Sequence, residues 1–261
     1  MTRPKDPIGG FDATVCSVAA PLTFGSLFAG IGGIDLGLER AGMECKWQVE
    51  IDNYATKVLE KHWPNVDRRR DARECGKDNL PWVDGIAGGF PCQDISSSGK
   101  RAGLDGNRSG LFYEFMRIVR ELRPRFVLME NVADLLVRGL PRVLGALAEI
   151  GYDAEWHCIP AADFGLPQGR DRIWIVANAY SERCEASEKR NGPRPFVVKR
   201  PNGNGLAEAQ RRARDDSSRE CRVAHGVSKG MDRNRCLGNA VPPIAAEWAG
   251  RQIIAMSREF A

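Results

Sequence analysis

A single cysteine stands in the segment GGFPCQDISSSGK, residues 88–100, between a proline and a glutamine. Cysteines that only pack are found on apolar strands or helix faces, whereas Cys92 is surrounded by small and turn-forming residues. It follows the end of a predicted strand, at the carboxyl edge of a sheet, where open α/β folds bind ligands. Nearby cations lower the pKa of such a thiol, and the following loop supplies Lys100, Arg101 and Arg108. The sequence therefore predicts a nucleophile, with an inert loop cysteine as the alternative.

A glycine-rich turn, FAGIGG at residues 28–33, lies between a predicted strand and a predicted helix. Glycines at such a turn let the backbone approach a ligand closely. Glu50 follows Gly30 by 20 positions at the end of the next predicted strand. Nucleoside-binding folds place the carboxylate that holds the ribose hydroxyls there. The glycine spacing departs from the dinucleotide fingerprint, so a tight structural turn is the alternative.

Charged residues mark two further strand boundaries. Glu130 ends an apolar strand; on its own it is best interpreted as a cap for the next helix, while in a cleft it would be a proton donor. Arg170 and Arg172 alternate with Asp171 and so share one face at the start of a strand. They could hold an anion or polarise a carbonyl, or they could form an exposed charged edge. The segment RCLGNAVPP, residues 235–243, predicts a turn that leads into a helix.

Strands alternate with helices along most of the chain. We predict strands at 21–27, 45–52, 82–90, 125–132, 153–165 and 170–179, and helices at 34–41, 53–63, 109–124, 139–152 and 242–260. Asn53 is the expected N-cap of the second helix, and Pro64 its stop. This alternation predicts an α/β fold with a mostly parallel sheet and helices on both faces.

The pattern fails between residues 181 and 234, where Gly, Pro, Asn, Ser and Arg dominate. From Ser181 to Arg235 the chain has 14 Lys and Arg against 8 Asp and Glu, although its net charge is only +4. This surplus favours an anionic partner, with a solvated loop as the alternative. We expect a catalytic domain at 1–180 and 235–261 and a short basic insert at 181–234.

Other features of the sequence narrow the class of protein. There are eight cysteines, no two of which form a C-x-x-C pair, so no metal site is predicted. No apolar stretch is long enough to span a membrane, and the first residues do not resemble a signal peptide. We therefore expect a cytoplasmic protein that is not associated with a membrane.

The motifs FAGIGG, PCQ, ENV, QGRDR and GNAV occur in the order found in the DNA (cytosine-5) methyltransferase family, which the chain resembles over residues 22–177 and 233–255. The resemblance implies a Rossmann-like fold that uses S-adenosylmethionine. It implies that Cys92 adds to cytosine C6, that Glu130 acts at N3, and that Arg172, with Arg170 beside it, lies near O2. The residues implied in cofactor binding are Phe28, Gly30, Gly32, Gly33, Glu50, Ile51, Asp71, Asn239 and Val241, and those expected to face DNA are Gln93, Ser96, Lys100, Arg101 and Arg108.

The chemistry of cytosine agrees with this set of residues. C5 becomes nucleophilic when a thiolate adds at C6 and N3 takes a proton, so one thiol, one acid and a cofactor pocket must converge. A base inside a duplex cannot reach such a site and must be flipped out. Residues 93–110 are the expected lid.

The region between the QGRDR and GNAV motifs is shorter than the family's target-recognition region and looks like that of small phage or prophage relatives. We therefore expect a short or relaxed target sequence, read by a monomer on double-stranded DNA. The alternatives are a tRNA cytosine methyltransferase and an inactive DNA-binding relative. A thiol hydrolase is disfavoured because no histidine lies near a motif.

Overall fold

The computed structural model describes residues 20–91, 110–165, 171–179, 236–237 and 239–259. In the first half of the chain the elements are β1 (Thr23–Leu27), α1 (Gly33–Ala41), β2 (Glu44–Val49), α2 (Asn53–His62), β3 (Asp67–Arg69), the 3₁₀ turn η1 (Ala72–Glu74) and β4 (Gly85–Gly88). They continue with α3 (Gly110–Leu122), β5 (Phe126–Val132), α4 (Leu135–Arg138), α5 (Leu140–Glu149), β6 (Tyr152–Pro160), η3 (Ala161–Phe164), β7 (Asp171–Ala179) and α8 (Pro243–Glu259).

The strands form one sheet in the order β3-β2-β1-β4-β5-β7-β6. Strands β3, β2, β1, β4 and β5 pair in parallel, and β7 runs antiparallel to both β5 and β6. The chain moves outward from β1 to β3 and then returns to place β4 on the other side of β1. The carboxyl ends of β1 and β4 therefore form a topological switch point, where a ligand crevice is expected. The prediction of a mostly parallel α/β sheet is confirmed.

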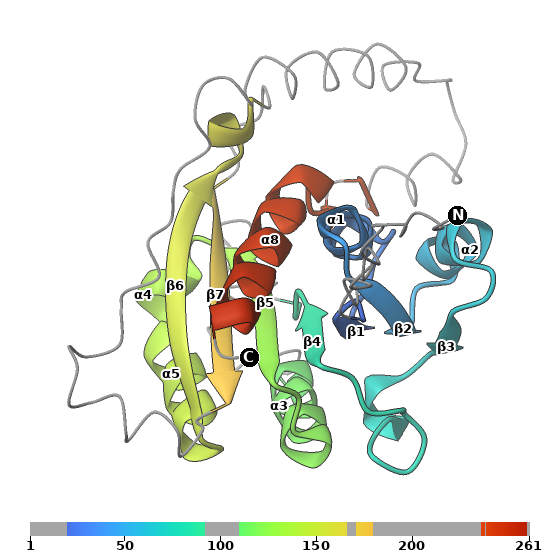
Figure 1. The fold of residues 1–261 in the computed structure, drawn as a ribbon, viewed down its shortest axis with the longest axis horizontal. Coiled ribbons are helices and arrows are strands. Elements are labelled where there is room, and N and C mark those ends of the chain that lie inside the picture. Colours follow the sequence, from blue (N-terminus) through green and yellow to red (C-terminus); the bar gives the residue numbers. More distant parts are fainter. Residues whose placement is uncertain (1–19, 92–109, 166–170, 180–235, 238, 260–261) are drawn as a thin grey trace, which may run out of the picture.

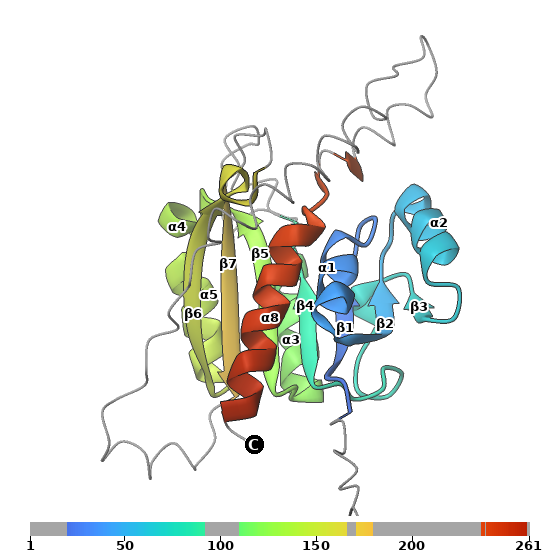
Figure 2. The same cartoon turned by 45° about the horizontal axis from the view of Figure 1, so that its top comes forward.

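Helices cover both faces of this sheet (Figures 1 and 2). Helices α1 and α8 lie in front of it in Figure 2, where Leu38 and Ala249 belong to one buried apolar cluster with Phe24 of β1. Helices α3 and α5 lie behind it, and Phe115 and Leu147 belong to a second cluster. The predicted two-sided covering is therefore confirmed.

Helix α8 approaches α1 closely because α1 carries glycines on the facing side. A Cβ on Gly37 would lie 2.4 Å from the Pro243 carbonyl oxygen, and one on Gly33 would lie 2.2 Å from the Val241 carbonyl oxygen. Residues from the C-terminal segment thus sit directly against the start of α1. This contact brings Val241 to the glycine-rich turn from the far end of the chain.

Two local predictions were wrong. The N-cap of α2 is Asp52 and not Asn53, since the Asp52 carboxylate accepts hydrogen bonds from the N–H groups of Tyr54 and Ala55, each at 2.9 Å. The strand predicted at 153–165 ends at Pro160, and η3 follows it. A short strand, β3, was missed because its sequence, DRR, has no apolar residue to mark it.

The basic insert predicted at 181–234 lies outside the described residues. Within the described part of the chain, no helix is long and apolar enough to cross a bilayer. The same residues contain no cluster of three His, Cys, Asp or Glu side chains suited to a metal ion.

Candidate active site

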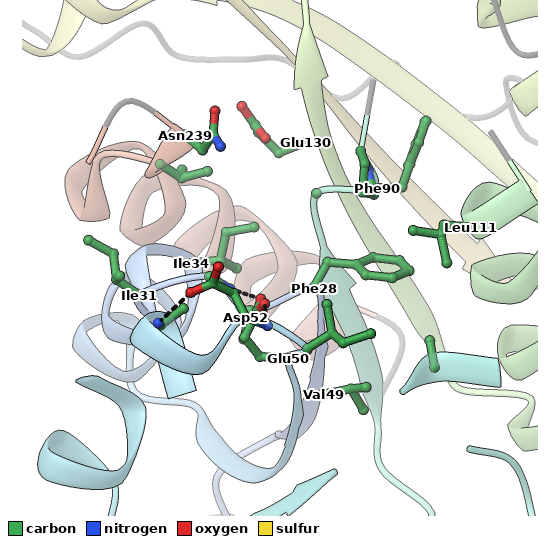
Figure 3. Close-up of a pocket in the computed structure, with 18 of the residues that line it drawn as sticks. Phe28, Ile31, Ile34, Val49, Glu50, Asp52, Phe90, Leu111, Glu130 and Asn239 are labelled. Atoms are coloured by element: carbon green, nitrogen blue, oxygen red, sulfur yellow. Dashed lines mark hydrogen bonds between the residues drawn. The ribbon is translucent and has the colours of Figure 1, made fainter. Parts of the chain in front are cut away.

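A cavity of about 680 Å³ lies at the carboxyl ends of β1, β2, β4 and β5. Its size falls within the usual range for small-molecule sites. Residues from the glycine-rich turn, the β2–α2 connection, the ends of β4 and β5 and the segment before α8 line it together (Figure 3). The switch point of the sheet therefore holds a pocket, as the topology requires.

The glycine-rich turn forms one wall of this cavity. Gly30 has a φ of 57°, and no atom lies within 4 Å of the position that a Cβ would occupy there. Phe28 has a φ of 55°, a left-handed conformation that is costly for a bulky residue. Its ring lies 6.5 Å from that of Phe115, centre to centre, and lines the cavity together with Leu111 (Figure 3). The turn thus holds the Phe28 ring at the cavity in a left-handed backbone conformation.

Gly32 does not line the cavity, unlike its neighbours in the turn. A Cβ at this position, where φ is 84°, would lie 2.4 Å from the ring of Trp63. Its role in this structure is close packing against the end of α2. The cofactor contact that the resemblance implied for Gly32 stays a prediction.

Glu50 joins the two loops that frame the cavity. Its carboxylate accepts a hydrogen bond from the Gly30 N–H at 2.7 Å and another from the Asp52 N–H at 2.7 Å. The side chain is 8% exposed and lies at the centre of the view in Figure 3. A carboxylate oxygen has two lone pairs, so each oxygen keeps one acceptor site for a ligand hydroxyl.

Glu130 lies in the cavity and is not a helix cap; the helix that follows, α4, has Asp134 at its N-cap position. The Nε of Arg172 on β7 lies 2.8 Å from Glu130 Oε1 on β5. Both side chains are largely buried, with exposed fractions of 10% for Glu130 and 19% for Arg172. An ion pair between two largely buried groups restricts the orientation of the carboxylate.

Two observations show how closely the segment after β4 approaches Glu130 and its neighbour Asn131. A Cβ on Gly89 would lie 2.8 Å from Glu130 Oε2, so only glycine lets the carboxylate come this close. Asn131 donates from Nδ2 to the Phe90 carbonyl oxygen at 3.2 Å. Pro91, the last described residue before Cys92, lines the same cavity as Glu130.

The remaining predicted cofactor residues also line the cavity. Ile51 is 59% exposed, and Asn239 and Val241 enter from the segment before α8. Asp71 is the N-cap of η1 and pairs with the Arg73 guanidinium at 2.6 Å, and this hydrogen bonding lowers the pKa of Asp71. The residues predicted in chemistry or DNA contact that lie outside the described part of the chain are Cys92, Gln93, Ser96, Lys100, Arg101, Arg108 and Arg170.

A buried carboxylate lies behind the glycine-rich turn. Asp35, in the first turn of α1, has no exposed surface and accepts hydrogen bonds from Ser26 Oγ at 3.0 Å and Gln48 Nε2 at 2.8 Å. Burial raises the pKa of Asp35 to about 6, although these hydrogen bonds oppose the shift. Arg68 donates to the Oε1 of Gln48 at 2.8 Å, so the network links α1 to β1, β2 and β3.

Several cavity residues were not predicted from the sequence. Among them are Asp52, Arg70, Leu111, Asn131 and Cys236. Asn131 stands beside Glu130 in the ENV motif, and this position was a signal that it has a role. The others reach the cavity only through the tertiary fold.

Comparisons with known proteins agree with this architecture. The Type II methyltransferase M2.BsuMI of Bacillus subtilis is 37% identical over 165 residues, which is 60% of this chain and 42% of that protein. The Type II methyltransferase M.AquIA of Picosynechococcus is 33% identical over 189 residues, covering 64% of this chain and 76% of that protein. The structure of the Entamoeba histolytica methyltransferase EhMeth aligns with a TM-score of 0.63 and 14% identity, over 90% of this chain and 98% of that one, and shows the same fold.

The chain spans less than half of the length of the first curated relatives that it matches. The model of the C-5 cytosine-specific DNA methylase family matches residues 22–216, well over half of the sequence. This chain therefore belongs to the C-5 cytosine-specific DNA methylase family.

Proposed function

We propose that this protein transfers a methyl group from S-adenosylmethionine to C5 of cytosine in DNA, through a covalent bond between Cys92 and C6 of a flipped-out base. The observation that carries the proposal is the position of Glu130. Its carboxylate is fixed by Arg172 in the cavity that also contains Glu50, and Pro91, next to Cys92 in the sequence, lines that cavity. The sequence relatives named as Type II methyltransferases support the same reaction.

The residues of the cavity fit the proposed cofactor. Phe28 offers an aromatic face to the adenine, and the Glu50 carboxylate retains acceptor sites for the ribose hydroxyls. Gly30 leaves open space where a side chain would stand, so a ligand can meet the backbone there. When bound, S-adenosylmethionine would supply an electrophilic methyl group on its sulfonium centre.

The chain's own residues would do the remaining chemistry. The Cys92 thiolate forms a bond to C6, the C5=C6 electron pair becomes available at C5, and Glu130 shares a proton with N3 to accept the charge that develops in the ring. After methyl transfer the C5 proton is lost to a base, the C5=C6 bond re-forms, the thiolate leaves and the N3 proton returns to Glu130. Arg172 keeps the Glu130 carboxylate oriented during both proton shifts.

The proposal includes the substrate and the setting. Duplex DNA is the substrate, the chain acts as a monomer in the cytoplasm of a bacterial cell, and the basic residues between 181 and 234 contact phosphates, which position DNA without reading its sequence. We propose a short or relaxed target for this reason. The methylated cytosines can be mapped by sequencing the product DNA. Methylation at one long, strictly required sequence would contradict the proposal of a relaxed target.

The reaction is tested with labelled S-adenosylmethionine and unmethylated duplex DNA. We expect label at cytosine C5 with the wild type and none with Cys92→Ser, while Cys158→Ser, at an exposed cysteine on β6, keeps full activity. Transfer to tRNA but not to duplex DNA would overturn the choice of DNA. If the wild type transferred no methyl group to duplex DNA or to tRNA, the assignment as an enzyme would be overturned.

A further inference from the structure

The pairing of β2 with β3 continues past the last residues of the two strands. The final register pair is Val49 with Arg69, and the Glu50 N–H then donates to the Arg69 carbonyl oxygen at 3.0 Å. Two residues beyond the end of β2, the carbonyl of Ile51 accepts a hydrogen bond from the guanidinium of Arg70. A side chain thus links the two segments just past the backbone ladder.

The same guanidinium reaches the first turn of α2. Arg70 donates to Asn53 Oδ1 at 2.6 Å and to the hydroxyl of Thr56. The Thr56 hydroxyl lies 3.2 Å from the Glu50 carbonyl oxygen and 2.7 Å from the Asp52 carbonyl oxygen. Arg70 therefore holds, directly or through Thr56, the whole connection between β2 and α2.

Helix stability does not account for a cation at this place. The N-terminus of a helix carries a partial positive charge, which favours acidic and not basic neighbours. The Asp52 carboxylate already caps α2 through two backbone N–H groups. Arg70 thus adds a like charge to a helix end that Asp52 already caps, so the stability of α2 does not require this cation.

The connection that Arg70 holds is a wall of the cavity. Glu50, Ile51, Asp52 and Arg70 all line it. The Ile51 side chain is 59% exposed, so core packing does not fix its position and its backbone must do so. A rotation of the Ile51 peptide would move this side chain and the neighbouring Glu50 carboxylate together.

We propose that Arg70 is a positioning residue for the adenosine end of the cofactor, because its hydrogen bonds to the Ile51 carbonyl, Asn53 and Thr56 hold Glu50 and Ile51 in the binding geometry before the ligand arrives. This inference rests on the proposed use of S-adenosylmethionine. Preorganised contacts raise affinity by removing the ordering cost from the binding step. The role of Arg70 belongs to cofactor binding and leaves methyl transfer itself unchanged.

The test compares Arg70→Ala with Arg69→Ala, since Arg69 is an exposed neighbour that pairs with Asp67 at 3.1 Å and does not line the cavity. Calorimetry gives the Kd for S-adenosylhomocysteine and for methylthioadenosine, and kinetics give KM for S-adenosylmethionine and kcat. For Arg70→Ala we expect both Kd values and KM to rise about tenfold, with kcat within about twofold of the wild type. Arg69→Ala should match the wild type.

Two further variants test the inference if Arg70→Ala folds poorly. Arg70→Lys should recover part of the affinity, because an ammonium group can reach one acceptor but cannot bridge three. Asn53→Ala, which removes one acceptor on an exposed residue, should weaken both ligands in the same direction by a smaller factor.

Three results would overturn the inference. Unchanged Kd values in Arg70→Ala would remove the positioning role. A joint fall in kcat, affinity and melting temperature would show a general structural role. Weaker binding of S-adenosylhomocysteine with unchanged binding of methylthioadenosine would show that Arg70 does not act on the adenosine end. Failure of the wild type to bind either ligand would overturn the proposed cofactor itself.

Discussion

Arg172 on β7 and Glu130 on β5 form an ion pair of 2.8 Å at the wall of the cavity, across two antiparallel strands. In the strand register Arg172 stands opposite Val132, so its side chain reaches diagonally to Glu130. The pair places a fixed carboxylate beside the end of β4, where the chain continues to Cys92. The geometry explains why these motifs, far apart in the sequence, form one site.

Removal of this ion pair should damage the chemical step. Arg172→Ala removes the ion pair that orients the Glu130 carboxylate, and we expect kcat to fall by about 10²-fold or more while the Kd for S-adenosylmethionine stays within about twofold. Arg125→Ala is the matched control, because Arg125 is half-exposed and pairs with Asp84 at 3.5 Å, before the start of β5. A loss of cofactor affinity in Arg172→Ala equal to the loss in kcat would contradict the assigned role.

The left-handed backbone at Phe28 predicts an unusual order of stability. Glycine adopts a φ of 55° without strain, whereas alanine does not, so Phe28→Gly should be more stable than Phe28→Ala by about 1 kcal/mol. Both variants should bind S-adenosylmethionine more weakly than the wild type, because both lose the aromatic face. Chemical denaturation measures the difference, and an alanine variant as stable as the glycine variant would show that the turn relaxes.

The close contact between α1 and α8 can be tested with two glycines in helices. Gly37→Ala should destabilise the protein by about 1–3 kcal/mol, since its Cβ would lie 2.4 Å from the Pro243 carbonyl oxygen. Gly145→Ala in α5 meets no atom within 4 Å and should stabilise by up to about 1 kcal/mol. Urea denaturation measures the free energy of unfolding of both variants. Equal changes in this free energy would mean that α8 does not pack against α1 as described.

The raised pKa of Asp35 makes stability depend on pH. Its folded pKa of about 6 exceeds the ordinary value of 3.8, so the folded state binds the extra proton and the contribution to stability is complete below 3.8 and lost as the pH rises through 6. The unfolding free energy of the wild type relative to Asp35→Asn should therefore fall by about 1 kcal/mol between pH 5 and pH 7.

The groups that face Asp35 are Ser26, Gln48 and Cys45, with the charge of Glu39 nearby. Asp67→Asn, at an exposed acid that pairs with Arg69, is the control variant to be measured over the same range. A pH-independent difference for Asp35→Asn would show that this carboxyl does not titrate there.

The sequence was sufficient to predict where the functional residues gather, because parallel strands end at a common edge and the motifs follow strand ends. It could not separate the two roles considered for Glu130, since the choice depends on Arg172, which reaches it through an antiparallel pairing that no local pattern marks. The cap of α2 differed by one residue because Asp52 and Asn53 both have side chains suited to capping. Arg70 was missed because, as with Glu130 and Arg172, its hydrogen-bond partners lie in another element of the fold.

The covalent bond to Cys92 is the central claim, and duplex DNA with 5-fluorocytosine at the target tests it most directly. The fluorine at C5 cannot leave as a cation, so after methyl transfer the double bond cannot re-form and the thiolate cannot be released. With S-adenosylmethionine present we predict a stable protein–DNA adduct whose mass includes one methyl group and whose peptide map places the bond at Cys92, with none formed by Cys92→Ser. Methylation of ordinary cytosine without any such adduct, or an adduct on another cysteine, would contradict the account.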